Sequence, residues 1–288
     1  MEENKIESIG LLEKIKSKYI LKTIFQILKE NKSLYIVKIN KLIQNKLDLS
    51  IKDYKNYTET KTKIIIEIKP KMGQYGEFIN IHNSDLQSYF HIYFNDNKKE
   101  IKKFYINKDD NVEKIKIIIN YQIKSFCRLF SNCKCIRSIK FIQFYRKDIE
   151  DMSWMFAFCS FLKEVNLSNL KTDNVTNMGY MFFQCSELEE VNLSNLKTDN
   201  VTNMSHMFFN CSKLKEINLS NLSTNKVIDM SCLFFGCIFL KVVDLSHCNL
   251  NQLKFTGHMF HNCSDKLIVK AKKDLRKRTY IEGLTKII

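Results

Sequence analysis

The chain has 288 residues, and 44% of them are hydrophobic, so it can bury a substantial core as one large or two modest domains. Its single Pro and seven Gly exclude collagen-like sequence and argue against flexible linkers. The formal net charge of +15 is typical of proteins that bind nucleic acid or anionic membranes. Residues 151–264, however, hold 8 Lys against 10 Asp plus Glu, a net charge of −2. The excess charge therefore lies on the flanks of this block, and binding of nucleic acid or of a membrane through them is an alternative that we favour less than binding of a protein.

The first residues, MEENKIESIG, carry acidic and then mixed charges, which argues against a signal peptide. No stretch reaches the roughly 18 consecutive apolar residues that a transmembrane helix needs. We therefore expect a cytoplasmic protein, in whose reducing surroundings the ten Cys remain thiols. A cell-surface protein exported without a signal peptide is the alternative.

Residues 1–55 are predicted to form a helical segment. Apolar residues recur at helical spacing on both sides of a break at residues 31–33. This stretch resembles an F-box, the three-helix module that docks on the Skp1 adaptor of ubiquitin ligases. The resemblance implies a Skp1 contact through Ile20, Ile24 and Phe25. A plain helical hairpin packed against the next domain explains the same pattern, so both interpretations stay open.

Residues 56–122 are predicted to be β-rich. They contain β-branched and aromatic runs at residues 63–68, 89–94 and 116–119, separated by polar turns. We expect this region to shield the first turn of the repeat block that follows, because the end of a repeat array otherwise exposes its core. Residues 265–288, which are basic, are expected to cap the other end.

Residues 123–264 consist of a repeat with a period of 26 residues. Each central copy has apolar residues at i, i+3, i+4 and i+7, as in Met178, Met181, Phe182 and Cys185, and this spacing predicts a short helix. The Asp or Asn before each stripe, Asn177 in this copy, is expected to cap that helix. The period is clearest in six cysteines: Cys133, Cys159, Cys185, Cys211, Cys237 and Cys263.

A short strand is predicted after each of these cysteines. Leu188, Val191 and Leu193 show the alternation of a half-buried strand. Neither a short strand nor a short helix can bury its apolar face alone, so the copies must stack. The predicted fold is an α/β repeat solenoid of the leucine-rich-repeat type, with one short strand and one short helix per repeat. It is preceded by the small helical segment and the β-rich region.

The repeat block resembles the BspA-like leucine-rich repeats. Residues 174–178 (NVTNM), residues 200–204 (NVTNM) and residues 188–196 match the pattern of that family. The resemblance implies a binding solenoid of the kind often displayed at a cell surface.

Polar residues between the buried strand positions are expected to line the concave face of the solenoid. Because like charges on adjacent strands repel, a stacked Glu column makes this face a candidate site for a basic or hydrogen-bonding partner. The alternative is a solvated face copied by repeat duplication. The candidate residues are Glu164, Asn166, Ser168, Glu190, Asn192, Ser194, Glu216, Asn218, Ser220 and Asp244.

A second outward column, Trp154, Tyr180 and His206, is a weaker candidate for binding on the convex face. The alternative is that these side chains only cover the convex face and bind nothing. The Cys column occupies a core position of the stripe, so we interpret it as buried thiols and expect neither metal nor disulfides. No cofactor or catalytic motif is recognisable. The sequence thus predicts a non-catalytic protein-interaction scaffold, with a ubiquitin-ligase substrate receptor and a cell-surface adhesin as alternatives.

Overall fold

The computed structural model describes residues 15–16, 41–46, 63–81, 84–120, 123–219, 221–249 and 251–270. The chain divides into two compact units, Met1–Lys61 and Thr62–Ile288. In the first unit, helix α4 (Lys41–Lys46) is described, with Ile43 buried. The residues expected to contact Skp1 (Ile20, Ile24 and Phe25) lie outside the described part of the chain.

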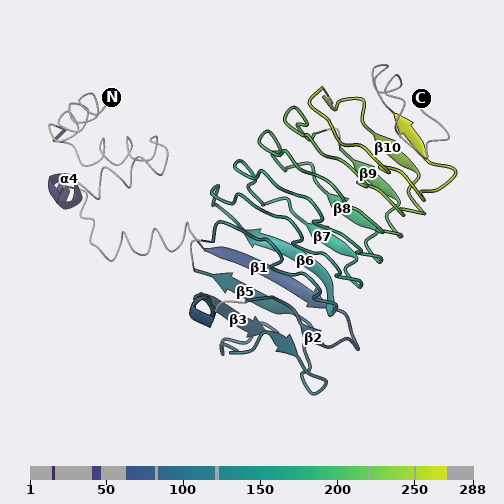
Figure 1. Ribbon diagram of the computed structural model, residues 1–288. Coiled ribbons are helices and arrows are strands. Elements are labelled where there is room, and N and C mark those ends of the chain that lie inside the picture. The colour runs from purple at the N-terminus through teal and green to yellow at the C-terminus, as the bar shows by residue number, and fades with distance from the viewer. Residues whose placement is uncertain are drawn as a thin grey trace. The chain divides into compact units, whose positions relative to one another are not determined.

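The second unit begins with antiparallel strands that share a sheet with the repeats (Figure 1). Strand β1 (Ile64–Pro70) pairs with β5 (Ile115–Ile119) on one side and with β6 (Ile136–Gln143) on the other. The edge strand β3 (Phe90–Phe94) pairs with β5 and follows a short 3-10 helix, η1 (Ser84–Tyr89). Strands β2 (Gly76–Glu77) and β4 (Tyr105–Ile106) form a separate ribbon. The β-rich region therefore continues the sheet of the repeat block.

The repeats add one three-residue strand per coil. Strands β7 (Glu164–Asn166) and β8 (Glu190–Asn192) extend the first sheet in parallel to β6. Strands β9 (Glu216–Asn218), β10 (Val242–Asp244) and β11 (Ile268–Lys270) form a second parallel sheet. The central residue of these strands faces the core: Val165, Ile217 and Val243 are buried. The predicted strands are confirmed in position and in orientation.

The predicted helix in each repeat is wrong. In an α-helix each N–H group bonds to the carbonyl four residues earlier. Here the N–H groups of Met152, Trp154, Phe156 and Phe158 instead donate to carbonyl oxygens one coil further on, over 2.7 to 3.1 Å. The alternate N–H groups close tight turns, as from Cys159 to the carbonyl of Phe156 at 3.1 Å. Within the described residues no helix exceeds six residues, so the protein is a β-solenoid and not an α/β leucine-rich-repeat fold.

Backbone conformation explains this difference. Trp154 and Phe158 have φ of +58° and +63°, and Tyr180 and Gln184 repeat these values at +60° and +56° in the next coil. A left-handed residue every fourth position breaks a helix and turns the chain instead. The side chain of Asn177, expected to cap a helix, accepts the N–H of Gly179 at 3.0 Å and so caps the start of a turn.

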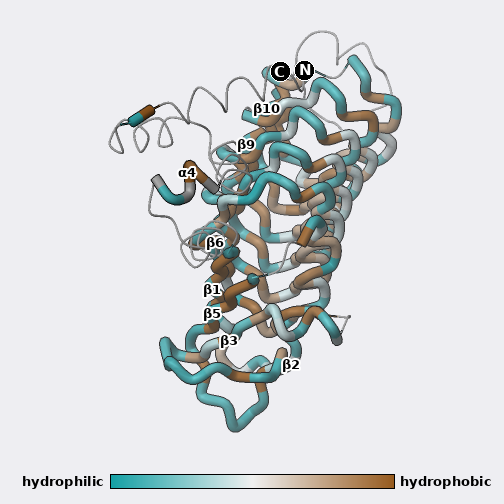
Figure 2. The backbone as a smooth tube through the Cα atoms, turned by 90° about the vertical axis from the view of Figure 1, so that its left-hand side faces the viewer, coloured by the Kyte–Doolittle hydropathy of each residue, from teal (hydrophilic) through white to brown (hydrophobic). Residues whose placement is uncertain are grey.

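The apolar stripe nevertheless identified the core correctly. Met152, Met155, Phe156 and Cys159 are all fully buried, because two successive turns bring the same four positions to the interior as a helix would. Figure 2 shows the coils stacked, with hydrophobic positions recurring at the same place in each. Six fully buried phenylalanine rings form a column through the core, with neighbouring rings parallel within 15° and their centroids 5.3 to 5.6 Å apart. Its members are Phe130, Phe156, Phe182, Phe208, Phe234 and Phe260.

The Cys column lies beside these rings, as buried thiols. The Sγ of Cys159 donates to the carbonyl oxygen of Phe130 at 2.9 Å, and Cys185 donates to that of Phe156 at 3.0 Å. Burial raises the pKa of both thiols well above the usual range. The predicted core position of this column is confirmed, since five of its six cysteines are buried and Cys263 is half-buried.

Candidate binding groove

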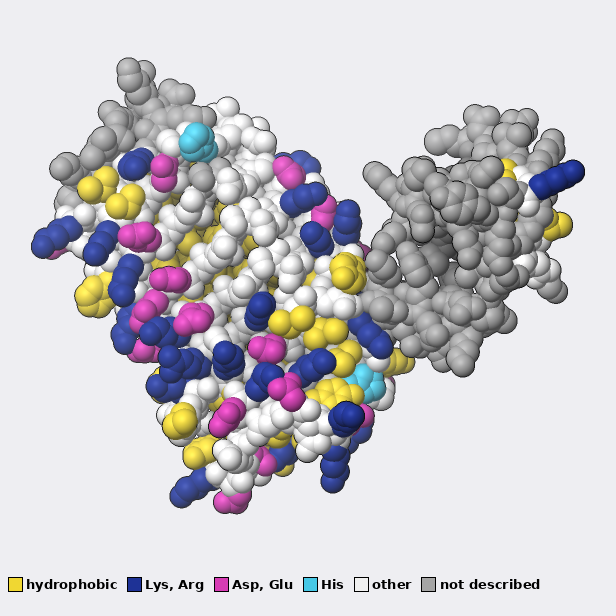
Figure 3. Space-filling model, turned by 180° about the vertical axis from the view of Figure 1, so that it is seen from behind, with side chains coloured by type: hydrophobic (Ala, Val, Ile, Leu, Met, Phe, Trp, Pro, Cys, Tyr) yellow, Lys and Arg dark blue, Asp and Glu magenta, His cyan; other side chains and the backbone are white. Residues whose placement is uncertain are grey.

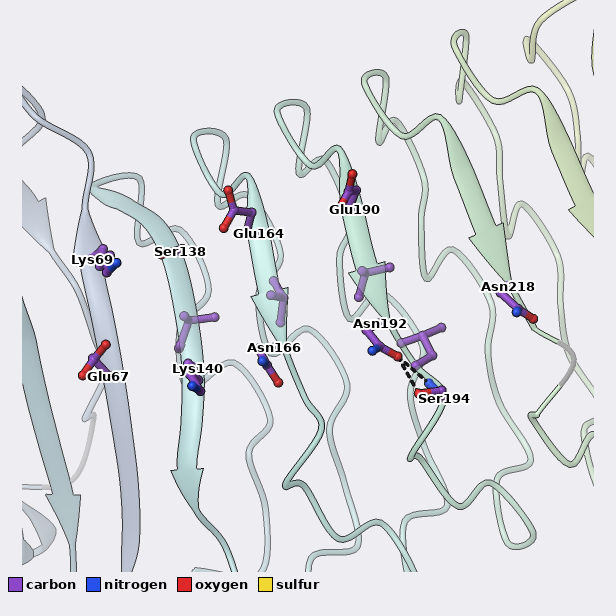
Figure 4. Close-up of a pocket in the computed structure, with 14 residues that line it drawn as sticks. Glu67, Lys69, Ser138, Lys140, Glu164, Asn166, Glu190, Asn192, Ser194 and Asn218 are labelled. Atoms are coloured by element: carbon purple, nitrogen blue, oxygen red, sulfur yellow. Dashed lines mark hydrogen bonds between the residues drawn. The ribbon is translucent and has the colours of Figure 1, made fainter.

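A groove of about 600 Å³ lies on the outward face of the first sheet, over β1, β6, β7 and β8, and ends at Asn218 of β9. Figure 4 shows its polar side chains in two rows that run across the strands. One row consists of Lys69, Ser138, Glu164 and Glu190, and the other of Glu67, Lys140, Asn166, Asn192 and Asn218. Ile139, Val165, Val191 and Leu193 also border the groove, but their side chains pack toward the core on the other side of the sheet.

The two ends of the groove differ in charge. Glu164 and Glu190 are register partners on adjacent parallel strands, which lie about 4.8 Å apart. Among the ion pairs of the described residues, none includes either carboxylate. At the other end Lys69 and Lys140 supply positive charge, with Glu67 as the register partner of Lys140. The groove therefore has an acidic end over the repeats and a mostly basic end over the β-rich region.

Glutamates just outside the groove are paired, in contrast to Glu164 and Glu190. Glu187 accepts from Lys213 at 2.8 Å, and Glu189 lies 3.3 Å from Lys163. The chain thus neutralises carboxylates beside the strands with lysines of neighbouring coils. It leaves the two groove carboxylates to solvent or to a partner.

The structure brings together most of the residues expected on the sheet face. Six of them line the groove: Glu164, Asn166, Glu190, Asn192, Ser194 and Asn218. Ser168, Glu216 and Asp244 do not line it, and Ser220 is not among the described residues. Sequence reasoning missed Glu67, Lys69, Ser138 and Lys140, which line the groove from β1 and β6. The alternation of Ile and charged residues at 66–69 marks an outward face, but nothing local shows which strands pair with it.

The side-chain oxygens of two Asn residues in the groove already accept hydrogen bonds from the protein itself. The Oδ1 of Asn166 accepts the N–H of Ser168 at 3.0 Å, and that of Asn192 accepts the N–H and hydroxyl of Ser194 at 2.9 and 2.7 Å. These Asx turns end each strand. A partner in the groove would therefore meet the amide N–H groups of these side chains more readily than their oxygens.

Trp154, Tyr180 and His206 do not line the groove. Their rings stack in a half-buried column, with centroids 4.1 Å apart between Trp154 and Tyr180 and 4.4 Å between Tyr180 and His206. The guanidinium of Arg128 covers the free side of Trp154 at 5.1 Å. Burial lowers the pKa of His206 and raises that of Tyr180.

Within the described ranges, no cluster of three or more His, Cys, Asp or Glu has the arrangement of a metal site. In the same part of the chain, no helix is long and apolar enough to cross a membrane. Acidic and basic side chains are intermixed on the face seen in Figure 3, without a large patch of one sign.

Stacked 26-residue coils define this molecule as a repeat β-solenoid. The chain matches the family described as "Mycoplasma protein of unknown function, DUF285" over residues 124–239 and 190–267, which together span half of its length. The protein belongs to this family. No curated protein and no solved structure matches the chain.

Proposed function

We propose that this protein is a non-catalytic binding protein whose groove holds a segment of a protein partner. The segment would place basic side chains over Glu164 and Glu190 and an acidic side chain over Lys69 and Lys140. The observation that carries the proposal is the pair of adjacent, unneutralised groove carboxylates. Like charges directly opposite each other on neighbouring strands destabilise a sheet, and a cation between them relieves that repulsion.

The size of the groove supports a short extended segment. From β1 to β9 there are four strand intervals of about 4.8 Å, a length of about 19 Å. An extended chain advances about 3.3 Å per residue, so about six residues span this length. The charged ends select the orientation of the segment.

The test uses fluorescent peptides of about six residues, a length set by the chain rise. One peptide has two Arg at one end and two Asp at the other, its mirror has the reverse order, and a third has only Ser and Gly. Anisotropy titration of the full chain should show binding of one charged peptide and no binding of the neutral one. Because the contact is charged, its affinity should fall as salt is raised.

Matched variants locate the site. Replacing Glu164 and Glu190 with Gln should weaken binding at least about tenfold, as expected when charge-assisted hydrogen bonds are lost. Replacing Glu187 and Glu189 with Gln should leave it unchanged, because these carboxylates pair with lysines outside the groove. Absence of binding by every peptide, or equal loss in both double variants, would refute the proposed function.

A second candidate is adhesion at a cell surface. It is supported by the BspA-like pattern of residues 174–178 and 200–204, a family whose repeats are often displayed there. Labelling of intact cells with a membrane-impermeant reagent tests it. Modification of this protein in intact cells favours adhesion, and modification only after lysis refutes it.

A further inference from the structure

The turn segments of the last five of the six coils form a second surface, here called the aromatic face, which is almost free of charge, whereas the first coil adds Arg128 and Lys134 at one end. These segments cover residues 151–160, 177–186, 203–212, 229–238 and 255–264. Apart from His, the only residues of these segments that carry a charge at neutral pH are Asp151 and Asp229, although 27% of the whole chain is charged. The Oδ1 atoms of both carboxylates accept backbone N–H groups at 2.8 Å, so they serve the turns. The depletion of charge is therefore specific to this face.

Two columns of half-buried rings run along this face. The first consists of Trp154, Tyr180 and His206, stacked as described above. The second consists of Phe183, Phe209 and Phe235, whose centroids lie 4.8 and 4.5 Å apart. The columns touch, since the rings of Tyr180 and Phe183 are 5.4 Å apart. Aromatic enrichment with charge depletion is the composition of interface cores, in contrast to ordinary surface.

The stacking restricts which ligands fit. The rings cover one another's faces within each column, and Arg128 covers the outer face of Trp154. A sugar or nucleobase needs an open ring face, which these columns do not provide. The two columns present ring edges in a flat row, interrupted by Ser, Asn and Gly. Such a row suits contact with another flat and uncharged protein surface.

We propose that the aromatic face pairs with the same face of a second copy of this chain. A twofold contact needs a self-complementary patch, and a patch without charge meets itself without opposing like charges. Its coils repeat about every 4.8 Å over about 19 Å, so two antiparallel copies keep the same spacing along their whole contact. The net charge of −2 over residues 151–264 adds little repulsion.

The size of the face sets the strength of pairing. Stable interfaces bury about 800 Å² and about 20–30 residues per partner, whereas six rings make up these two columns. The dimer should therefore be weak and concentration-dependent. This inference is independent of the groove, and the two respond differently to salt: groove binding should weaken at high salt, but pairing through an uncharged face should not.

Sedimentation velocity of the full chain, from about 1 μM to about 300 μM, tests the inference in the range expected for weak contacts. Gly257→Lys places a charge on the face without a clash, since nothing lies within 4 Å of an added Cβ there. Gln184→Lys replaces a half-buried polar side chain next to Phe183 with a charged one. The matched control is Asn174→Lys, at an exposed loop position outside the turn segments.

A concentration-dependent dimer that persists at high salt is expected. It should weaken at least about tenfold in Gly257→Lys and Gln184→Lys but not in Asn174→Lys. A wild-type chain that stays monomeric at every concentration would overturn the inference. So would a dimer that is equally stable in all three variants, because it would then form through another face.

Discussion

The side chain of Asn210 lies against the α-carbon of Gly236, where an added Cβ would come within 2.0 Å of Oδ1. Gly236 also has a φ of +72°, in the left-handed region that favours glycine. Gly236→Ala should therefore destabilise the protein by about 1–3 kcal/mol, from strain and crowding together. Urea denaturation measures the loss. Gly257→Ala is the control and should be close to neutral, because its Cβ meets nothing within 4 Å.

The buried ring column should dominate stability. Phe208 stacks between Phe182 and Phe234, with centroid distances of 5.4 and 5.6 Å, and is fully buried. Phe208→Ala should cost about 3–5 kcal/mol, since the stacked coils cannot collapse onto the space. Phe239 is 57% exposed, so Phe239→Ala should change the free energy of unfolding by less than about 0.5 kcal/mol. Equal effects of the two substitutions would show that the column does not hold the coils together.

Reactivity of the cysteines should follow burial. Cys127 is exposed, whereas Cys185 is buried, donates to a carbonyl and has a raised pKa. Because the thiolate is the reactive form, alkylation of the native protein should modify Cys127 first. Cys185 should react only on unfolding. Peptide mass mapping after a short pulse of reagent measures the order, and early modification of Cys185 would contradict its place in the core.

His206 should make stability depend on pH. Burial beside the rings of Tyr180 and Phe209 lowers the pKa of His206, an effect that outweighs the opposing charge of Asp229. As the pH falls below about 6.5, the ordinary pKa of His, the unfolded chain binds a proton at residue 206, whereas the folded chain binds it only at a lower pH. The contribution of His206 to stability is therefore complete above about pH 6.5 and declines as the pH falls. Relative to the His206→Phe variant, whose side chain does not titrate, the wild type should lose thermal stability as the pH is lowered from about 7 to about 5.

The sequence predicts what is periodic in this protein. The 26-residue interval placed Phe182 and Cys185 in the core and Glu190 on an outward strand face, since a repeat that stacks must bury the same positions in every coil. It did not distinguish a helix from successive turns, because both bury the same stripe. One signal was present: Asn132, Asn210, Asn262 and Gly236 occupy a single column, and Asn and Gly adopt positive φ most readily.

The basic end of the groove depends on a pairing that no local pattern reveals. Lys69 and Lys140 lie on β1 and β6, which become neighbours only because β1 inserts between β5 and the first repeat strand. Antiparallel pairing at long sequence separation leaves no spacing signal in either segment. The acidic end was predictable for the opposite reason, because Glu164 and Glu190 are one repeat period apart.

Binding in the groove is tested most directly by a photo-crosslinking residue that replaces Asn192 in the groove or, in a second variant, exposed Asn174 outside it. Each variant is irradiated with the charged peptide that binds the wild-type chain. Binding in the groove predicts a crosslink from position 192, lost when Glu164 and Glu190 are replaced by Gln, and none from position 174. Crosslinking from position 174 alone, or from 192 regardless of the two carboxylates, would contradict binding in the groove.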